Sequence, residues 1–224
     1  MTSPQPTHSP TDLAAFSVVI IEDDLLLSDL LARVMRDRLQ LKEMHVFATG
    51  SHGLNHCLAH PPDLLIVDMG LPDVSGREVI RILHETHPSL RIIVLTGETN
   101  PHLPAELLSL GVSGFVHKTS RLEELERAVR RVLEDGLYFS TNVKLTPAHR
   151  SSPGANASSP LTLLTERERE IARMVASGMI SKEIASQLHL SPRTVEKARA
   201  QILAKLGLRD LPGLVRWCMH QGLI

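Results

Sequence analysis

The stretch Leu64-Leu65-Ile66-Val67-Asp68 decides the fold, because it is a short, wholly apolar run that ends in a carboxylate. Three other short runs end in polar residues in the same way: Val18-Val19-Ile20-Ile21 before Glu22-Asp23-Asp24, Ile92-Ile93-Val94-Leu95 before Thr96, and Gly114-Phe115-Val116-His117 before Lys118. Short apolar runs separated by helical patterns predict buried parallel strands. Because sites in such sheets lie beyond the carboxyl ends of the strands, we expect these polar side chains to meet at one edge.

Helical patterns fill the gaps between the apolar runs, at residues 25–39, 51–59, 76–87, 102–110 and 121–135. The third begins near Ser75-Gly76 and ends before Pro88, because a residue that precedes proline disfavours the helical conformation. These four runs and the alternating helices predict an α/β fold with a doubly wound parallel sheet, which we take to have five strands and five helices.

The C-terminal quarter has a different, all-helical pattern, with helices over 165–176, 181–188, 192–206 and 211–221. Thr165 and Glu168 fit a capping box at the first of them. Ser191 is placed as an N-cap before a proline, and Gly207 as the residue that ends the third helix. These signals predict a small four-helix domain, and the helix pair 181–188 and 192–206 has the form of a helix-turn-helix.

The chain of 224 residues therefore divides into four parts. We expect a disordered tail over 1–14, the α/β domain over 15–137, a flexible Ser-, Pro- and Gly-rich linker over 138–160, and the helical domain over 161–224. Charge follows this division: residues 1–160 carry a net −5 and residues 161–224 a net +4. This asymmetry favours a small-ion site in the first domain and a polyanion partner for the second.

Composition indicates a cytoplasmic protein that does not associate with membranes. No apolar run approaches the ~20 residues of a membrane span, and the N-terminus lacks the features of a signal peptide. The two cysteines, Cys57 and Cys218, fall in different predicted domains, so we expect no disulfide between them. Four histidines, His45, His52, His56 and His60, lie close in sequence but match no zinc-site spacing, and we interpret them as scattered surface or half-buried residues.

The order of these motifs resembles that of the receiver domain of two-component response regulators over about residues 15–135. The resemblance rests on the acidic pair after the first run, the Asp68-Met69-Gly70-Leu71-Pro72 segment, Thr96, Phe115 and Lys118. The helical domain is similar to LuxR-type DNA-binding domains in three segments: Leu163-Leu164-Thr165-Glu166-Arg167-Glu168-Arg169-Glu170-Ile171, Lys182-Glu183-Ile184-Ala185, and Ser191-Pro192-Arg193-Thr194-Val195-Glu196-Lys197. Together they resemble the NarL/FixJ family, which implies a CheY-like fold for the first domain.

The resemblance implies a phosphorylation site centred on Asp68, the phosphoacceptor. Thr96 and Lys118 would contact the phosphoryl group, and Phe115 would be a switch residue, unless it only fills the core. A hard cation, Mg²⁺, prefers oxygen ligands; Glu22, Asp23, Asp68 and the carbonyl of Gly70 would supply them. Asp24 is then a flanking acid; the alternative is that it caps the next helix. Thr119 stands where many relatives have proline, which leaves the isomer of the preceding peptide bond open.

The helix 192–206 is the predicted recognition helix, whose start enters the major groove of DNA. The candidate contacts are Lys182, Arg193, Thr194, Glu196, Lys197, Arg199 and Lys205. Ala198 and Ala200 depart from relatives at positions near the bases, so no DNA sequence is carried over. The last helix would form a dimer contact through Leu214, Val215 and Cys218, or would only close the domain core.

The sequence thus predicts a DNA-binding transcription factor that a sensor histidine kinase switches by phosphorylating Asp68, with double-stranded DNA as its target and a homodimer formed on phosphorylation or on DNA. The alternative is a constitutive DNA binder whose receiver serves assembly. An α/β enzyme is disfavoured, because the sequence shows no nucleophile–base pair and no glycine-rich phosphate loop.

Overall fold

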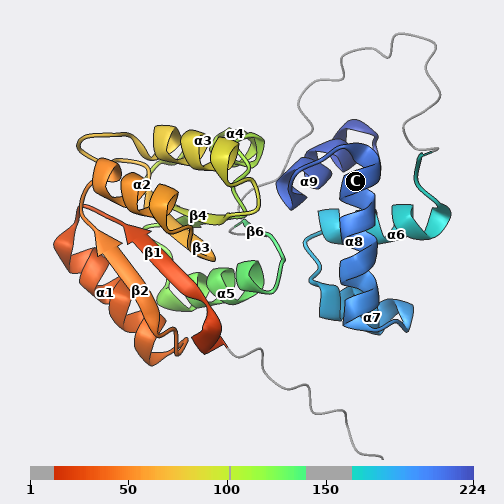
Figure 1. Cartoon of the computed structure of the whole chain (residues 1–224), viewed down its shortest axis with the longest axis horizontal. Helices are drawn as coiled ribbons and strands as arrows, with labels where there is room; N and C mark the ends of the chain where they lie inside the picture. Colours follow the sequence, from red (N-terminus) through yellow and green to blue (C-terminus); the bar gives the residue numbers. More distant parts are fainter. Residues whose placement is uncertain (1–12, 101, 140–162) are drawn as a thin grey trace, which may run out of the picture.

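The computed structural model describes residues 13–100, 102–139 and 163–224, and it has two parts (Figure 1). The first is built on a parallel sheet with the strand order β2-β1-β3-β4-β5-β6. The strands are β1 (Ser17–Ile21), β2 (Glu43–Phe47), β3 (Leu64–Asp68), β4 (Arg91–Thr96), β5 (Gly114–His117) and β6 (Tyr138–Phe139). The doubly wound α/β prediction is confirmed. The tail over 1–14 and the linker over 138–160 lie almost wholly outside the described residues.

The sheet has one strand more than the sequence predicted. Tyr138 and Phe139, which we assigned to the start of the linker, pair with Gly114 and Phe115 as β6. The backbone N–H of Tyr138 also donates to the carbonyl of Ser113 at 3.1 Å. The free edge of β5 offers backbone hydrogen-bond partners to the chain as it leaves α5 (Leu122–Leu133), so β6 can form there. A two-residue strand is too short to show a periodic pattern, which is why the sequence did not predict it.

Helices cover both faces of the sheet, as the alternation of side chains along each strand requires. On β3, Leu64 and Ile66 belong to the core under α1 (Leu25–Asp37) and α5 (Leu122–Leu133). Leu65 and Val67 point the other way, into the core under α2 (Gly50–Ala59), α3 (Gly76–Thr86) and α4 (Leu103–Ser109). The β3 strand is therefore apolar throughout because both of its faces are buried.

Polar side chains fix where the helices start around the strand ends. Asp24 caps α1, since its carboxylate accepts from the N–H groups of Leu26 and Leu27 at 2.9 and 3.1 Å. Asp73, in the loop after β3, accepts from the N–H groups of Gly50 and Ser51 at 2.8 and 3.0 Å and so caps α2 from a distant segment. Hydrogen bonds from Ser51 are the main cause that lowers the pKa of Asp73 well below its usual range. These caps anchor the loops that surround Asp68.

The second part contains α6 (Glu166–Ala176), α7 (Ser181–Leu188), α8 (Pro192–Leu206) and α9 (Leu211–His220). The predicted four-helix pattern is confirmed. Thr165 and Glu168 form the expected capping box, and Gly207 ends α8 in the left-handed conformation at φ 65°. No helix within the described ranges is long and apolar enough to cross a membrane.

The two parts touch through α4 and α9. Leu108 of α4 is buried within the apolar core of the helical part. Its backbone carbonyl also accepts a hydrogen bond from the guanidinium of Arg216 on α9 at 2.6 Å. The helical part is therefore packed on the receiver-like part and not merely tethered to it.

Candidate functional site

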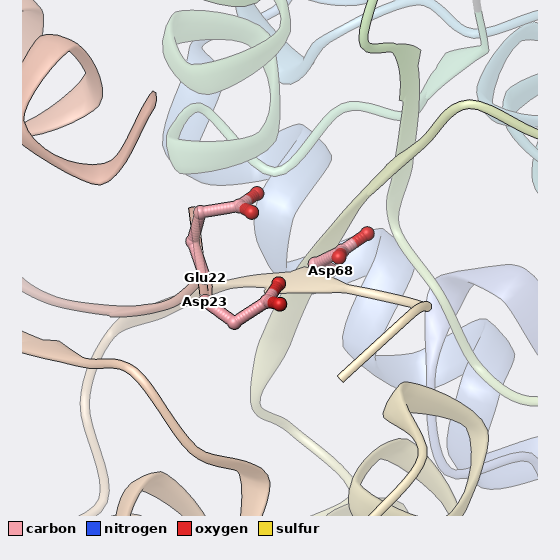
Figure 2. A group of neighbouring side chains, drawn as sticks. All are labelled: Glu22, Asp23 and Asp68. Atoms are coloured by element: carbon pink, nitrogen blue, oxygen red, sulfur yellow. The ribbon is translucent and has the colours of Figure 1, made fainter. Parts of the chain in front are cut away.

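Three carboxylates converge at the carboxyl edge of the sheet, as the sequence predicted. Glu22 and Asp23 follow β1, and Asp68 ends β3; one carboxylate oxygen of each lies within 4.8 Å of the others. Figure 2 shows the three side chains turned toward a common space. Glu22 and Asp68 are only 1% and 5% exposed, whereas Asp23 is exposed. The site is thus a partly buried acidic group that remains open to solvent on the side of Asp23.

Lys118 joins this group from the end of β5. Its ammonium lies 2.9 Å from Oε1 of Glu22 and 3.0 Å from Oδ2 of Asp68. Burial acts to lower the pKa of Lys118, but hydrogen bonds and attraction to Glu22 and Asp68 outweigh it, and the net pKa is raised. Lys118 is therefore a stable cation that already contacts Asp68.

The group has the composition of a metal site for a hard cation. Burial raises the pKa of Glu22, against the hydrogen bond from Lys118, and its Oε2 atom is buried without a partner among the described residues. Three carboxylates and one ammonium leave an excess of negative charge, and all available ligand atoms are oxygens. A dication would supply both the missing charge and a partner for Oε2.

Gly70 and Gly76 let the backbone pass close to Asp68. A Cβ at Gly70 would lie 3.5 Å from Oδ2 of Asp68, so the backbone of Gly70 borders the carboxylate. A Cβ at Gly76 would clash with the carbonyl oxygen of Asp68, which only glycine avoids. Gly76 is therefore a positioning residue that was not predicted; its place at the start of α3, directly after the Asp68 loop, was the available signal.

Thr96 and Phe115 complete the edge. Thr96 is buried at the end of β4, and its Oγ1 atom accepts from the N–H of Glu98 at 3.0 Å, which leaves its own proton available to donate. Phe115 is buried in the core under α3 and α4, so in this conformation its ring fills the core. No peptide bond in the described ranges is cis, and the bond between Lys118 and Thr119 is therefore trans.

The start of α8 presents the predicted DNA-contacting side chains to solvent. Arg193, Thr194, Glu196 and Lys197 are all exposed. Ser191 caps this helix by accepting from the N–H of Thr194 at 3.1 Å. A cluster of exposed polar and basic side chains at the start of the second helix of a helix-turn-helix is the arrangement that DNA recognition requires.

Three other predicted DNA contacts are already engaged within the chain. Arg199 is only 4% exposed, and its guanidinium donates to Oγ of Ser181 at 2.6 Å and to the carbonyl of Asp135 in the receiver-like part. Lys182 pairs with Glu134 at 3.1 Å, and Lys205 pairs with Glu168 at 2.7 Å. Arg199, predicted as a DNA contact, is therefore covered in this conformation, because its position on α8 faces α7 and the other domain.

The predicted dimer residues Leu214, Val215 and Cys218 do not form a surface. All three are buried in the core of the helical part, on the side of α9 that faces α6 and α4. In this conformation α9 closes the core of the helical part, which was the alternative to a dimer contact. Sequence periodicity identified the apolar side of α9 but not what covers it, because α4 comes from the other domain.

Charged side chains at the end of α5 form a second set of contacts between the two parts. The guanidinium of Arg131 donates to the carbonyl of Gly178 at 2.5 and 3.0 Å and to the carboxylate of Glu183 at 3.0 and 3.2 Å. Another contact between the two parts joins α3 to the start of α9, where Nε2 of His84 lies 3.2 Å from Oδ2 of Asp210. No sequence motif marks these residues, since contacts between domains leave no periodic pattern.

Comparison with known proteins agrees with this geometry. Residues 18–130 match the model of the response regulator receiver domain, and residues 162–218 match that of bacterial regulatory proteins of the luxR family. The chain therefore belongs to the two-component response regulators of the NarL/FixJ family, with a receiver domain followed by a LuxR-type DNA-binding domain. It is a regulator of transcription and not an enzyme.

Curated relatives match the chain over nearly its full length. The response regulator UvrY of Escherichia coli (strain K12) is 27% identical over 92% of this chain and 95% of its own. The transcriptional regulatory protein UhpA of Salmonella typhimurium is 33% identical over 87% of this chain and 93% of its own. Among solved structures, RcsB from Salmonella enterica serovar Typhimurium, bound to the promoter rprA with a phosphomimetic, matches with a TM-score of 0.52 at 23% identity, covering 92% of this chain and 98% of that one. That likeness shows the shared fold.

Proposed function

We propose that this regulator is switched by phosphorylation of Asp68 by a sensor histidine kinase, and that the switch controls its binding to double-stranded DNA. The observation that carries the proposal is the contact of a buried Asp68 with Lys118 beside two further carboxylates. Phosphoryl transfer needs mainly positioning and charge neutralisation, which such a group provides.

The transfer follows from the position of these atoms. A carboxylate oxygen of Asp68 attacks the phosphorus of a phosphohistidine on the kinase; the new P–O bond forms as the P–N bond breaks, and the released imidazole takes up a proton. Lys118, at 3.0 Å from the Asp68 oxygen, then neutralises phosphoryl charge, and Thr96 donates its hydroxyl proton to a phosphoryl oxygen. Mg²⁺, held by Glu22, Asp23, Asp68 and the carbonyl of Gly70, would supply further positive charge when bound.

An apolar patch beside the site supports docking of a protein kinase. Leu25 and Leu26, in the first turn of α1, are 72% and 82% exposed, and they directly follow the acidic segment after β1. Leu30, one turn later, is also exposed. Such apolar side chains at the rim of a polar site are a typical protein-interaction surface.

The contacts between the two parts explain how Asp68 could control DNA binding. Arg77 of α3 bridges Glu98, in the loop after Thr96, and Glu106 of α4, with N–O distances of 3.4 and 2.7 Å. The same α4 packs on α9 through Leu108. A movement of Thr96 toward a phosphoryl group would therefore act on α4, the helix on which the DNA-binding domain packs. If the DNA-binding domain then separated from the receiver, Arg199 and α9 would be uncovered.

Release of α9 from α4 would also uncover the side of α9 that carries Val215, which lies with Leu108 in a pocket between the two parts, and this supports a homodimer on DNA as the active form. A solved structure of the related fold describes two RcsB dimers bound to two parallel DNAs. A dimeric helix-turn-helix protein reads two half-sites about one helical turn apart, on the order of 10 bp.

The test compares the wild-type chain with Asp68→Asn in the presence of Mg²⁺ and a small phosphodonor. We expect a phosphorylated wild-type protein, seen by phosphate-affinity electrophoresis, with tighter DNA binding and a shift toward dimers by light scattering. Asp68→Asn should show neither change. Equal DNA binding by both proteins, with and without phosphodonor, would instead favour the constitutive regulator in which the receiver serves assembly.

A further inference from the structure

Three histidines form a row where the edge strand β2 meets α2. His45 lies on β2, His56 in the last turn of α2 and His60 at its C-cap. The ring centroids of His45 and His56 are 4.5 Å apart, and those of His56 and His60 are 5.3 Å apart. The sequence pattern had suggested unrelated surface histidines, whereas the fold brings residues from two elements together.

Neither the core nor the phosphorylation site accounts for this row. His45 and His60 are exposed and His56 is half-buried against Phe47, with ring centroids 5.0 Å apart. Within the described ranges, no carboxylate or hydroxyl is hydrogen-bonded to any of these three rings. Their nitrogens are therefore available as ligands on the outer side of the sheet, away from the contacts between the two domains.

We propose that His56, together with His60 and His45, binds a first-row transition-metal dication such as Zn²⁺ or Ni²⁺. Imidazole nitrogens suit these ions, and no hard oxygen ligand competes in the row. His56 and His60 are four residues apart at the C-terminal end of α2, and their rings are neighbours, with centroids 5.3 Å apart. Two imidazoles that share one tetrahedral ion have ring centroids about 5 Å apart, which matches both observed separations.

The outer rings must turn for all three nitrogens to reach one ion. Within the part of the chain that the structure describes, only the acidic group at Asp68 already has three ligand atoms within 4.8 Å. His45 and His60 are exposed, and exposed side chains change rotamer within picoseconds to nanoseconds. The bound ion would tie the edge strand β2 to α2 and leave a fourth position for water.

The experiment is a calorimetric titration of the full-length chain with Zn²⁺ at neutral pH, in excess Mg²⁺ to occupy the acidic group. We expect one Zn²⁺ per chain. His56→Ala should weaken binding at least tenfold, and His45→Ala and His60→Ala several-fold each. His52→Ala is the matched control, because His52 lies one turn earlier on α2 and its ring is instead hydrogen-bonded to Oγ1 of Thr49 at 2.9 Å.

A thermal melt separates binding from damage to the fold, since His56 also packs on Phe47. Zn²⁺ should raise the Tm of the wild type and of His52→Ala, and should leave that of the double variant His45→Ala/His60→Ala unchanged. The proposal is overturned if the variants of the row bind Zn²⁺ as the wild type does, or if His52→Ala weakens binding as much as His56→Ala. Either result would mean nonspecific binding by surface histidines only.

Discussion

The proposed phosphorylation site and the predicted DNA-binding surface differ in how complete they are within one chain. At the sheet edge, Lys118 already contacts both Asp68 and Glu22. On α8, by contrast, Lys197 is exposed while Arg199 is buried against the receiver. The proposed phosphorylation site, the input site of the chain, is thus assembled by the receiver alone, whereas the DNA-binding surface, its output site, depends on where the other domain lies.

Lys118→Ala should change the response of the chain most, and it tests whether the input site is complete as it stands. Without the ammonium, the charge on phosphorylated Asp68 loses its nearest neutralising group, so the phosphodonor-dependent gain in DNA binding should fall by at least tenfold. The measurement is a DNA-binding titration with and without phosphodonor, alongside quantified phosphorylation. A full response in this variant would mean that Lys118 only balances the charge of Glu22.

An intermediate effect is expected from Lys197→Ala, which tests the exposed part of the output site. Loss of a guanine contact costs about 1–3 kcal/mol, so DNA affinity should then fall by roughly 5- to 150-fold. If Lys197 contacts phosphate, the slope of affinity against salt should also decrease by about one. Lys205→Ala is the comparison, because Lys205 already pairs with Glu168 and should lose less. Equal losses for both lysines would contradict the distinction between exposed and engaged side chains.

The smallest expected effect is a gain, from Arg131→Ala, which removes contacts between the domains. Arg131 holds Gly178 and Glu183 with a partly exposed side chain, so its loss should weaken the contact by about 1 kcal/mol, or roughly fivefold. Basal DNA binding by the unphosphorylated chain should rise accordingly in a fluorescence-anisotropy titration. Arg81→Ala is the control, since among the described residues Arg81 pairs with Glu78 and Glu85 of its own helix, α3. Unchanged basal binding would show that this contact does not restrain the output domain.

Sequence alone located the input site because strand ends are fixed by the sheet. Each apolar run predicted a buried strand, and parallel strands place their carboxyl ends at one edge of the sheet. Asp68 and Lys118 could therefore be placed close together in space although they are fifty positions apart in the chain. Helix caps such as Thr165 were also predictable, because they depend only on nearby residues in the chain.

What sequence could not predict depends on packing between distant segments. Nothing near Arg199 or Val215 in the chain indicates that the receiver covers them, and β6 is too short to carry a pattern. The histidine row is a similar case, because His45 and His56 meet only when β2 and α2 pack together.

Leu108 has a thermodynamic consequence for the whole chain. This side chain belongs to α4 of the receiver, yet it is buried within the core of the DNA-binding domain. Removing the helical domain, or melting it, would return that apolar surface to water and weaken the receiver as well. The two domains should therefore unfold as one cooperative unit while they are docked, and as two independent units once the switch has separated them.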